Sequence, residues 1–169
     1  ATVHKLVYHE KVIYAVGPVL SEYVPSRVPG KVDTFFEGTW SSQNSAMSDL
    51  TDLAFDKGQL FVSSFGYGVE LRDAQNSLMV FDETNSPLSN SNPPERFVNI
   101  TALENDTGGI WVSNYGAVES LHWLSNDKAW QPYSFTQNAT RYPLDLITDF
   151  YNNVWMILDP EQGGGVLVH

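Results

Sequence analysis

The sequence predicts an all-β protein, and within that class a β-propeller segment of about three and a half four-stranded blades. Short runs rich in Val, Ile, Leu, Phe, Tyr and Trp alternate with clusters of Gly, Asn, Asp, Ser and Pro, a pattern typical of strands joined by turns. The pattern also repeats along the 169 residues at intervals of 44 to 50 positions, which is the length of one propeller blade.

One aromatic residue in each copy marks the repeat, at separations of 47, 50 and 44 positions: Tyr14, Phe61, Trp111 and Trp155. Residues 50–63 align with residues 100–113 without a gap, and each segment continues into a turn of Gly and aromatic residues. A single sheet of this size buries too little apolar surface to be stable alone. We therefore expect the blades to stack face to face, with the aromatic residues of the repeat between them.

Four blades are expected in chain order, the last of them incomplete, as part of a larger propeller: residues 2–44, 48–88, 97–135 and 142–169. The third shows the strand pattern most clearly, from the axis outward: residues 100–105, 110–113, 117–124 and a strand ending near 130–135. Its first turn, at 106–109, contains two Gly residues, and Gly readily adopts the positive φ that a tight reversal needs.

Polar turns followed by Trp indicate where the outer strands of the blades lie. The segment Thr34–Trp40 resembles Leu124–Trp130, and residues 77–81 fill the same place in the second blade. The linkers at 83–95 and 136–143 are polar and contain Pro. We interpret them as crossovers from the outer strand of one blade to the inner strand of the next.

The chain carries 9 Lys and Arg against 20 Asp and Glu, a formal net charge of −11, and it contains no Cys. The acid excess would repel phosphate, so binding to nucleic acid or to bare anionic lipid is not expected. No apolar run approaches the roughly 20 residues of a membrane-spanning helix, so membrane insertion is not expected. The lack of Cys excludes disulfides, zinc–thiolate sites and cysteine nucleophiles.

No residues have the spacing of a catalytic or metal site, so we expect no enzyme activity, no cofactor and no bound metal. The carboxylate pairs Asp49/Asp52 and Asp145/Asp149 could serve acid–base chemistry, but they have no placed partner and are interpreted as solvated turn charges. The motif Asp-x-Gly-x-x-Trp at 106–111 is similar to the Asp box of sialidase-like propellers, which is mainly a turn device.

Binding is expected on one face of the propeller, where the loops between second and third strands emerge together with the crossovers at 83–95 and 136–143. Loops on a rigid scaffold commonly carry function. The candidate residues on this face are Phe65, Tyr67, Asn114, Tyr115, Asp159, Glu161 and Gln162. The alternative interpretation is that the tyrosines only cover the ends of the blades.

Several segments resemble the β-propeller repeats of Bacteroidetes envelope proteins: residues 62–70, 81–88, 109–115, and 152–155 followed by 163–165. Two families share such repeats, the PorZ-type proteins of the type IX secretion system and the periplasmic sensors of hybrid two-component systems. The details favour the PorZ type.

The PorZ resemblance implies a non-enzymatic scaffold at the outer-membrane surface. Such a protein joins an attachment complex with a sortase-like protein partner and recognises lipopolysaccharide. The net charge of −11 departs from this pattern because it disfavours an anionic glycan, so a local basic patch or another domain would have to bind the glycan. The second family implies instead a periplasmic ligand-sensing propeller.

Propellers usually have about four to eight blades, so the segment is not expected to close a ring by itself. An incomplete ring exposes two apolar blade faces and unpaired strand edges, and the isolated chain is therefore expected to self-associate. Either a second copy covers these faces, or other parts of the parent chain complete the ring. The second alternative is favoured because the last blade breaks off at His169.

Overall fold

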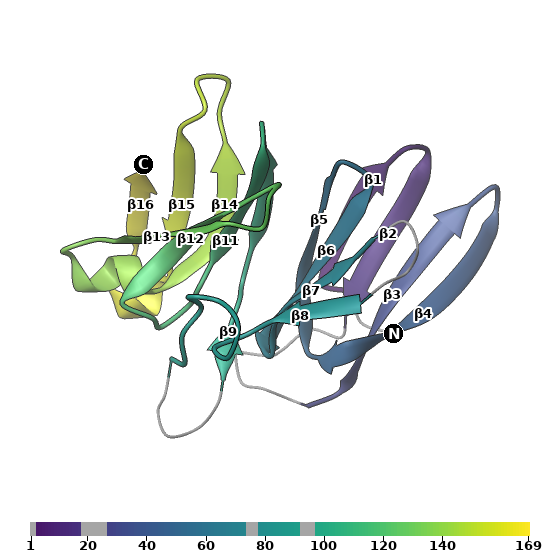
Figure 1. Ribbon diagram of the computed structural model, residues 1–169, viewed down its shortest axis with the longest axis horizontal. Coiled ribbons are helices and arrows are strands. Elements are labelled where there is room, and N and C mark those ends of the chain that lie inside the picture. Colours follow the sequence, from purple (N-terminus) through teal and green to yellow (C-terminus); the bar gives the residue numbers. More distant parts are fainter. Residues whose placement is uncertain (1–2, 18–26, 74–77, 92–96) are drawn as a thin grey trace.

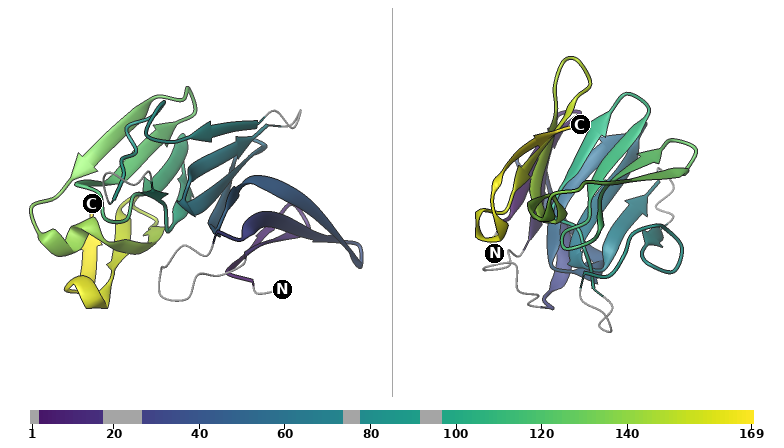
Figure 2. Two further views of the ribbon diagram at one scale, coloured as in Figure 1. Left: turned by 90° about the horizontal axis from the view of Figure 1, so that it is seen from below. Right: turned by 90° about the vertical axis from the view of Figure 1, so that its left-hand side faces the viewer.

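The computed structural model describes residues 3–17, 27–73, 78–91 and 97–169. It confirms the all-β fold class, with four antiparallel sheets that fan out side by side as an open arc (Figures 1 and 2). Each sheet is called a blade below and is numbered along the chain. These ranges also contain two short 3-10 helices, η1 (Asn138–Arg141) and η2 (Pro160–Gln162). No helix in the described ranges is long and apolar enough to span a bilayer.

Strands that follow one another in the sequence are neighbours in every blade, the order typical of propellers. Blade 1 contains β1 (Lys5–His9), β2 (Val12–Gly17), β3 (Pro29–Phe36) and β4 (Thr39–Ser48). Blade 2 contains β5 (Leu50–Asp56), β6 (Gln59–Gly66), β7 (Gly68–Arg72) and β8 (Leu78–Phe81), and the short β9 (Val98–Asn99) pairs with β6. Blade 3 contains β10 (Leu103–Asp106), β11 (Gly109–Ser113), β12 (Glu119–Ser125) and β13 (Trp130–Ser134). Blade 4 contains β14 (Pro143–Thr148), β15 (Val154–Leu158) and β16 (Gly165–Val168).

The tight turns inside the blades use positive φ angles, which match the right-handed twist of the strands they join. Glu10 and Lys11, with φ of 46° and 69°, connect β1 to β2. Lys57 and Gly58, with φ of 47° and 74°, connect β5 to β6. In blade 3 the φ of Gly108 is 103°, which confirms the turn predicted between the first two strands.

Three of the four aromatic repeat residues pack as the sequence predicts. Tyr14, Phe61 and Trp111 lie on the forward face of their blades, which we define as the face toward the next blade in the sequence. Phe61 is 2% exposed and Trp111 is 8% exposed. The rear face of the following blade supplies aliphatic partners, three to a blade: Leu53, Leu60 and Val62; Leu103, Ile110 and Val112; Leu146, Val154 and Met156.

Trp155 is the exception, and the prediction that it is buried between blades is wrong. Its side chain is 38% exposed, because no further blade of the described structure covers the forward face of blade 4. The neighbouring side chains on this face belong to β14, β15 and β16 and are also exposed: Ile147, Ile157, Val166 and Val168.

The innermost strand of blade 3 is shorter than predicted. Residues 100–102 lie between β9 and β10 in the sequence and belong to neither strand. There the Oγ of Ser113 accepts the backbone N–H groups of Thr101 and Ala102 at 3.1 and 2.8 Å. For these two N–H groups a side chain of the neighbouring strand β11 thus replaces the backbone carbonyl as acceptor, whereas the Ser113 N–H still donates to the Ala102 carbonyl at 3.1 Å. Register shifts fall at the corresponding places of β5 and β14, so this break is a feature of the repeat.

Candidate binding site

The loops predicted to carry binding do meet on one side of the arc. Phe65 is the penultimate residue of β6, Tyr115 lies between β11 and β12, and Asp159 lies between β15 and η2. The rings of Phe65 and Tyr115 are 5.7 Å apart between centroids, and Tyr142 packs edge-on against Tyr115 at 5.3 Å. The Tyr115 hydroxyl donates to Asp159 Oδ2 at 2.5 Å. Loops of blades 2, 3 and 4 therefore form one connected surface, which we call the loop face.

Three of the seven candidate residues are buried and hold the loops in place. Phe65 is 2% exposed, Asn114 is 0% exposed and Asp159 is 6% exposed. The Asn114 amide accepts the Ser89 N–H at 2.8 Å and donates to the carbonyls of Ser89 and Asn99 at 3.2 and 3.4 Å. These three side chains are positioning residues of the loop face.

The other four candidates reach the surface. Tyr67 is 41% exposed, Tyr115 is partly buried, and Glu161 and Gln162 are exposed. Tyr115 packs against two aromatic rings and donates to a carboxylate, as the alternative interpretation, that the tyrosines cover the ends of the blades, predicts. Tyr67 instead extends from the short link between β6 and β7.

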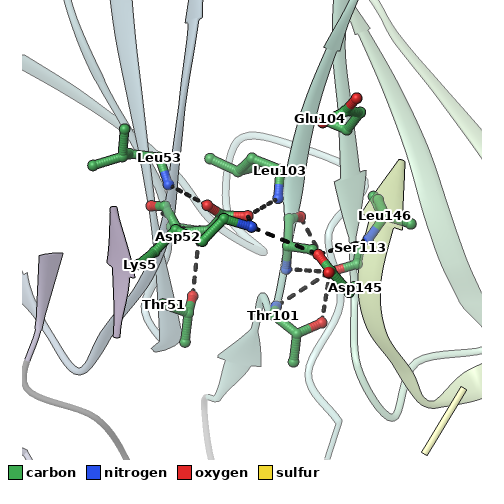
Figure 3. Close-up of polar contacts among 12 residues, drawn as sticks. Lys5, Thr51, Asp52, Leu53, Thr101, Leu103, Glu104, Ser113, Asp145 and Leu146 are labelled. Carbon is green, nitrogen blue, oxygen red and sulfur yellow. Dashed lines mark hydrogen bonds and ion pairs between the residues drawn. The ribbon is translucent and has the colours of Figure 1, made fainter. Parts of the chain in front are cut away.

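A second polar site lies where the inner strands of blades 1, 2 and 4 approach one another (Figure 3). The Lys5 ammonium is 3.4 Å from Asp52 Oδ2 and 3.7 Å from Asp145 Oδ1. Asp52 also accepts the backbone N–H of Leu53 at 2.8 Å and that of Leu103 at 3.0 Å. We call Lys5, Asp52 and Asp145 the axial cluster.

Charge and burial are unequal within the axial cluster. Burial raises the pKa of Asp52 to about 6, because attraction to Lys5 and the two backbone N–H groups offsets only part of the cost of leaving water. Burial alone would lower the pKa of Lys5, but the Asp52 and Asp145 carboxylates outweigh it and raise that pKa. Burial is the dominant cause of the pKa shift for Asp52 but not for Lys5, because the Asp52 side chain is 2% exposed whereas the Lys5 side chain is 38% exposed.

The sequence contains a signal for this cluster that the prediction missed. One repeat position at the axis lies directly before a Leu of the innermost strand in every blade. Its residues are Lys5, Asp52, Ala102 and Asp145. Only the assembled arc shows that these charges meet. They border a cavity of about 270 Å³ whose other lining residues are His4, Thr51, Thr101 and Leu144.

The remaining acidic candidates are turn residues. Asp49 lies in the turn between β4 and β5, but it is 0% exposed, so the prediction that it is solvated is wrong, and its carboxylate accepts the Arg27 backbone N–H at 2.8 Å. The Trp111 indole donates to Asp106 at 3.4 Å and the Trp155 indole to Asp149 at 2.9 Å, so both carboxylates close the turn before the aromatic repeat residue. Hydrogen bonds from the turn lower the pKa of Asp149 to about 2. In the described ranges no three His, Asp or Glu side chains are grouped as they would be around a metal ion.

The fold and these two polar surfaces define the chain as a partial, propeller-like assembly of blades. No protein-family model and no curated protein sequence matches it. Among solved structures, PorZ, a bacterial surface component of the type IX secretion system of Porphyromonas gingivalis, matches with a TM-score of 0.79 and 13% identity. The match covers 98% of this chain and 24% of PorZ.

Two further structures share the fold. The extracellular domain of a putative hybrid two-component system of B. thetaiotaomicron matches with a TM-score of 0.61 and 11% identity, over 97% of this chain and 27% of that domain. The computationally designed protein Ika4 matches with a TM-score of 0.65 and 13% identity, over 100% of this chain and 91% of Ika4. This chain thus spans about a quarter of the length of PorZ and of the sensor domain.

Proposed function

We propose that the chain is an extracytoplasmic, non-enzymatic binding scaffold that belongs to the attachment complex of a type IX secretion system at the outer-membrane surface. The observation that carries this proposal is the similarity to PorZ, whose TM-score of 0.79 over 98% of the chain exceeds the 0.61 of the sensor domain. A rigid loop face on a stack of blades is suited to holding another molecule.

A protein partner suits the loop face better than lipopolysaccharide does. The Arg141 guanidinium donates to the carbonyls of Gly116 and Ala117 at 3.1 and 3.3 Å and is therefore engaged with backbone oxygens. The same face carries acidic groups, because the Asp159 carboxylate accepts the Tyr115 hydroxyl and the Glu161 backbone N–H and Glu161 is exposed, in a chain with a net charge of −11. Exposed Tyr surrounded by fixed polar groups is typical of protein interfaces. Recognition of lipopolysaccharide then falls to another part of the complex.

A capture experiment tests this proposal. The purified chain is immobilised and exposed to solubilised outer membranes of a type IX-secreting Bacteroidetes strain and of an isogenic strain without the system. We expect a secretion-complex subunit to be recovered from the first strain, and Tyr67→Ala to reduce its recovery at least tenfold. Tyr151→Ala is the matched control, because Tyr151 is 81% exposed in the turn between β14 and β15, away from the loop face. Recovery of no such subunit, or equal recovery with Tyr67→Ala, would refute the proposal.

The second candidate function is that of a ligand-sensing propeller in a hybrid two-component system. The axial cavity of about 270 Å³, with Lys5, Asp52 and Asp145 at its wall, favours this alternative because it offers both charge signs to a small polar ligand. A thermal-shift screen with small sugars and amino acids distinguishes the two functions. A rise in melting temperature that Asp145→Asn abolishes and Tyr67→Ala preserves would support the sensor.

A further inference from the structure

A cleft of about 400 Å³ lies between the forward face of blade 1 and the rear face of blade 2. Strands of both blades supply its apolar lining: Val12, Tyr14, Val32, Phe36, Phe55 and Leu60. Its polar lining consists of Thr34, Gln43, Arg72 and Asp73. The volume is within the range of about 300–1,000 Å³ that is typical of small-molecule sites.

Three polar residues of the cleft occupy repeat positions that are apolar or aromatic in the other two blade interfaces. The strand registers align these positions, and the corresponding residues of the interfaces 1–2, 2–3 and 3–4 are Thr34, Leu71 and Trp123; Gln43, Phe81 and Tyr133; and Arg72, Leu124 and His169. The first interface therefore departs from the repeat at all three positions.

Rings fill the equivalent space in the other two interfaces. Between blades 2 and 3, Phe81 is 5% exposed and packs edge-on against Trp130, with 5.4 Å between the ring centroids. Between blades 3 and 4, the rings of Tyr133 and His169 are 4.5 Å apart. The cleft is thus the place of an aromatic group that the first interface lacks. A flat ring bound there would recover contacts that the other interfaces make with their own side chains.

Hydrogen-bond donors remain unused at the polar side of the cleft. The Arg72 side chain is 7% exposed, and three of its five N–H groups donate: Nε to Glu70, Nη1 to Gln43 Oε1 at 3.0 Å, and Nη2 to the Asn44 carbonyl at 3.0 Å. Within the described residues, the other two N–H groups and the Gln43 amide nitrogen have no acceptor. These donors are suited to a carbonyl oxygen of a ligand.

The charges around the cleft favour an uncharged ligand. The buried Glu70 carboxylate already neutralises the Arg72 guanidinium, and Asp73 adds a negative charge to the lining. A ligand carboxylate would therefore meet two acidic side chains against one basic one, whereas a neutral carbonyl accepts the same hydrogen bonds without that repulsion.

We propose that the cleft between blades 1 and 2 binds a small, uncharged aromatic compound with a carbonyl group. Its ring lies at Thr34, where blade 3 has a Trp, and its carbonyl oxygen accepts from Arg72 and Gln43. This site goes beyond the proposed scaffold function. Gly58 of the cleft precedes β6 and Tyr67 of the loop face follows it, so the two sites lie at opposite ends of that strand. Either site can therefore fail its test while the other stands.

Benzamide is the probe, and nuclear magnetic resonance of the ¹⁵N-labelled full chain is the measurement. We expect saturable binding with a dissociation constant of about 10 mM or lower, the range for a ligand of this size. The side-chain signals of Arg72 Nε and of the Gln43 amide should shift, and the backbone signal of Tyr67 should not. Benzoate tests the charge preference and cyclohexanecarboxamide tests the need for a flat ring. Each should bind about tenfold more weakly than benzamide.

Thr34→Trp is the decisive variant, because it gives blade 1 the residue that blade 3 has at this position. It should abolish benzamide binding without lowering the melting temperature. Ser42→Trp is the matched control, because Ser42 pairs with Asp33 on the opposite face of blade 1 and should leave binding unchanged. If Thr34→Trp lowers the melting temperature, Gln43→Ala replaces it and should weaken binding about tenfold, since it removes one of the donors.

Four results would overturn the proposal. They are the absence of a saturable shift at the Arg72 and Gln43 side chains, undiminished binding by the folded Thr34→Trp or Gln43→Ala variant, equal binding of cyclohexanecarboxamide, and tighter binding of benzoate than of benzamide.

Discussion

Two buried titratable groups should give opposite pH dependences of stability that nearly cancel in the wild type. Burial raises the pKa of Asp52 to about 6, from 3.8 in the unfolded chain. Between these values the folded protein keeps a proton that the unfolded chain has released, so the free energy of unfolding falls as pH rises from about 4 to about 6. The difference of about two pKa units corresponds to about 3 kcal/mol.

His122 has the opposite effect. Burial lowers its pKa to about 4, from 6.5 in the unfolded chain, although a hydrogen bond of 2.8 Å between its Nε2 and the Glu119 carbonyl opposes that shift. Between pH 4 and 6.5 the unfolded chain binds a proton that the folded protein does not, so stability increases with pH, again by about 3 kcal/mol. The two groups titrate over overlapping ranges with opposite sign. Their joint contribution should therefore be almost flat from pH 4 to 6.

Single variants separate the two contributions. Urea unfolding followed by Trp fluorescence at pH 4, 5, 6 and 7 gives the free energy of unfolding with dilute protein, which is needed near the isoelectric point of about 4.5. Relative to the wild type, Asp52→Asn should gain about 3 kcal/mol between pH 4 and 6, and His122→Gln should lose a similar amount. The other acidic groups are common to all three proteins and cancel in the differences. Profiles that stay parallel to the wild type would refute this reasoning.

Two matched pairs test the packing. Trp111→Ala should lower the free energy of unfolding in urea by about 3–5 kcal/mol, because the ring is 8% exposed between blades. Trp155→Ala changes the same repeat position where the ring is 38% exposed, and it should lower the free energy of unfolding of the monomer by at most about 2 kcal/mol. Equal costs would contradict the blade-interface assignment. Gly68→Ala should lower the melting temperature far more than Gly58→Ala. Both glycines have a positive φ, but a Cβ at Gly68 would lie 2.0 Å from the Phe81 carbonyl oxygen, whereas a Cβ at Gly58 would meet nothing within 4 Å. Similar melting temperatures for the two variants would show that the close approach of β7 to β8 is not required.

The repeat explains how much of the fold the sequence could predict. Tyr14, Phe61 and Trp111 experience the same surroundings in successive blades, so an aromatic residue every 44 to 50 positions is sufficient to locate the interfaces. The exposure of Trp155 could not be obtained in the same way. Its residue type and repeat position equal those of Trp111, and its burial depends on whether another blade follows.

The axial cluster could not be predicted from local sequence pattern, for a different reason. Lys5 and Asp145 are 140 positions apart, and their distance of 3.7 Å depends on the curvature accumulated over four blades. The raised pKa of Asp52 likewise follows from its burial in the assembled arc. The sequence alone suggested that Asp52 and Asp145 were solvated turn charges. For Asp52 this is wrong, because its side chain is 2% exposed and accepts hydrogen bonds from two blades.

The loop face shows why residue type alone does not separate packing from binding. Tyr115 and Tyr67 both follow a strand at a Gly-aromatic turn, but Tyr115 packs on other rings whereas Tyr67 is 41% exposed. The difference arises from the flanking residues of Tyr67. Gly66 and Gly68 have φ of 132° and 85°, and a Cβ at Gly68 would collide with the β8 backbone, so the path of the chain at Tyr67 is sterically fixed. A side chain held outward by a fixed backbone loses less conformational entropy when a partner binds. Tyr67 is for this reason the loop-face residue whose removal should weaken partner binding with the least effect on the fold.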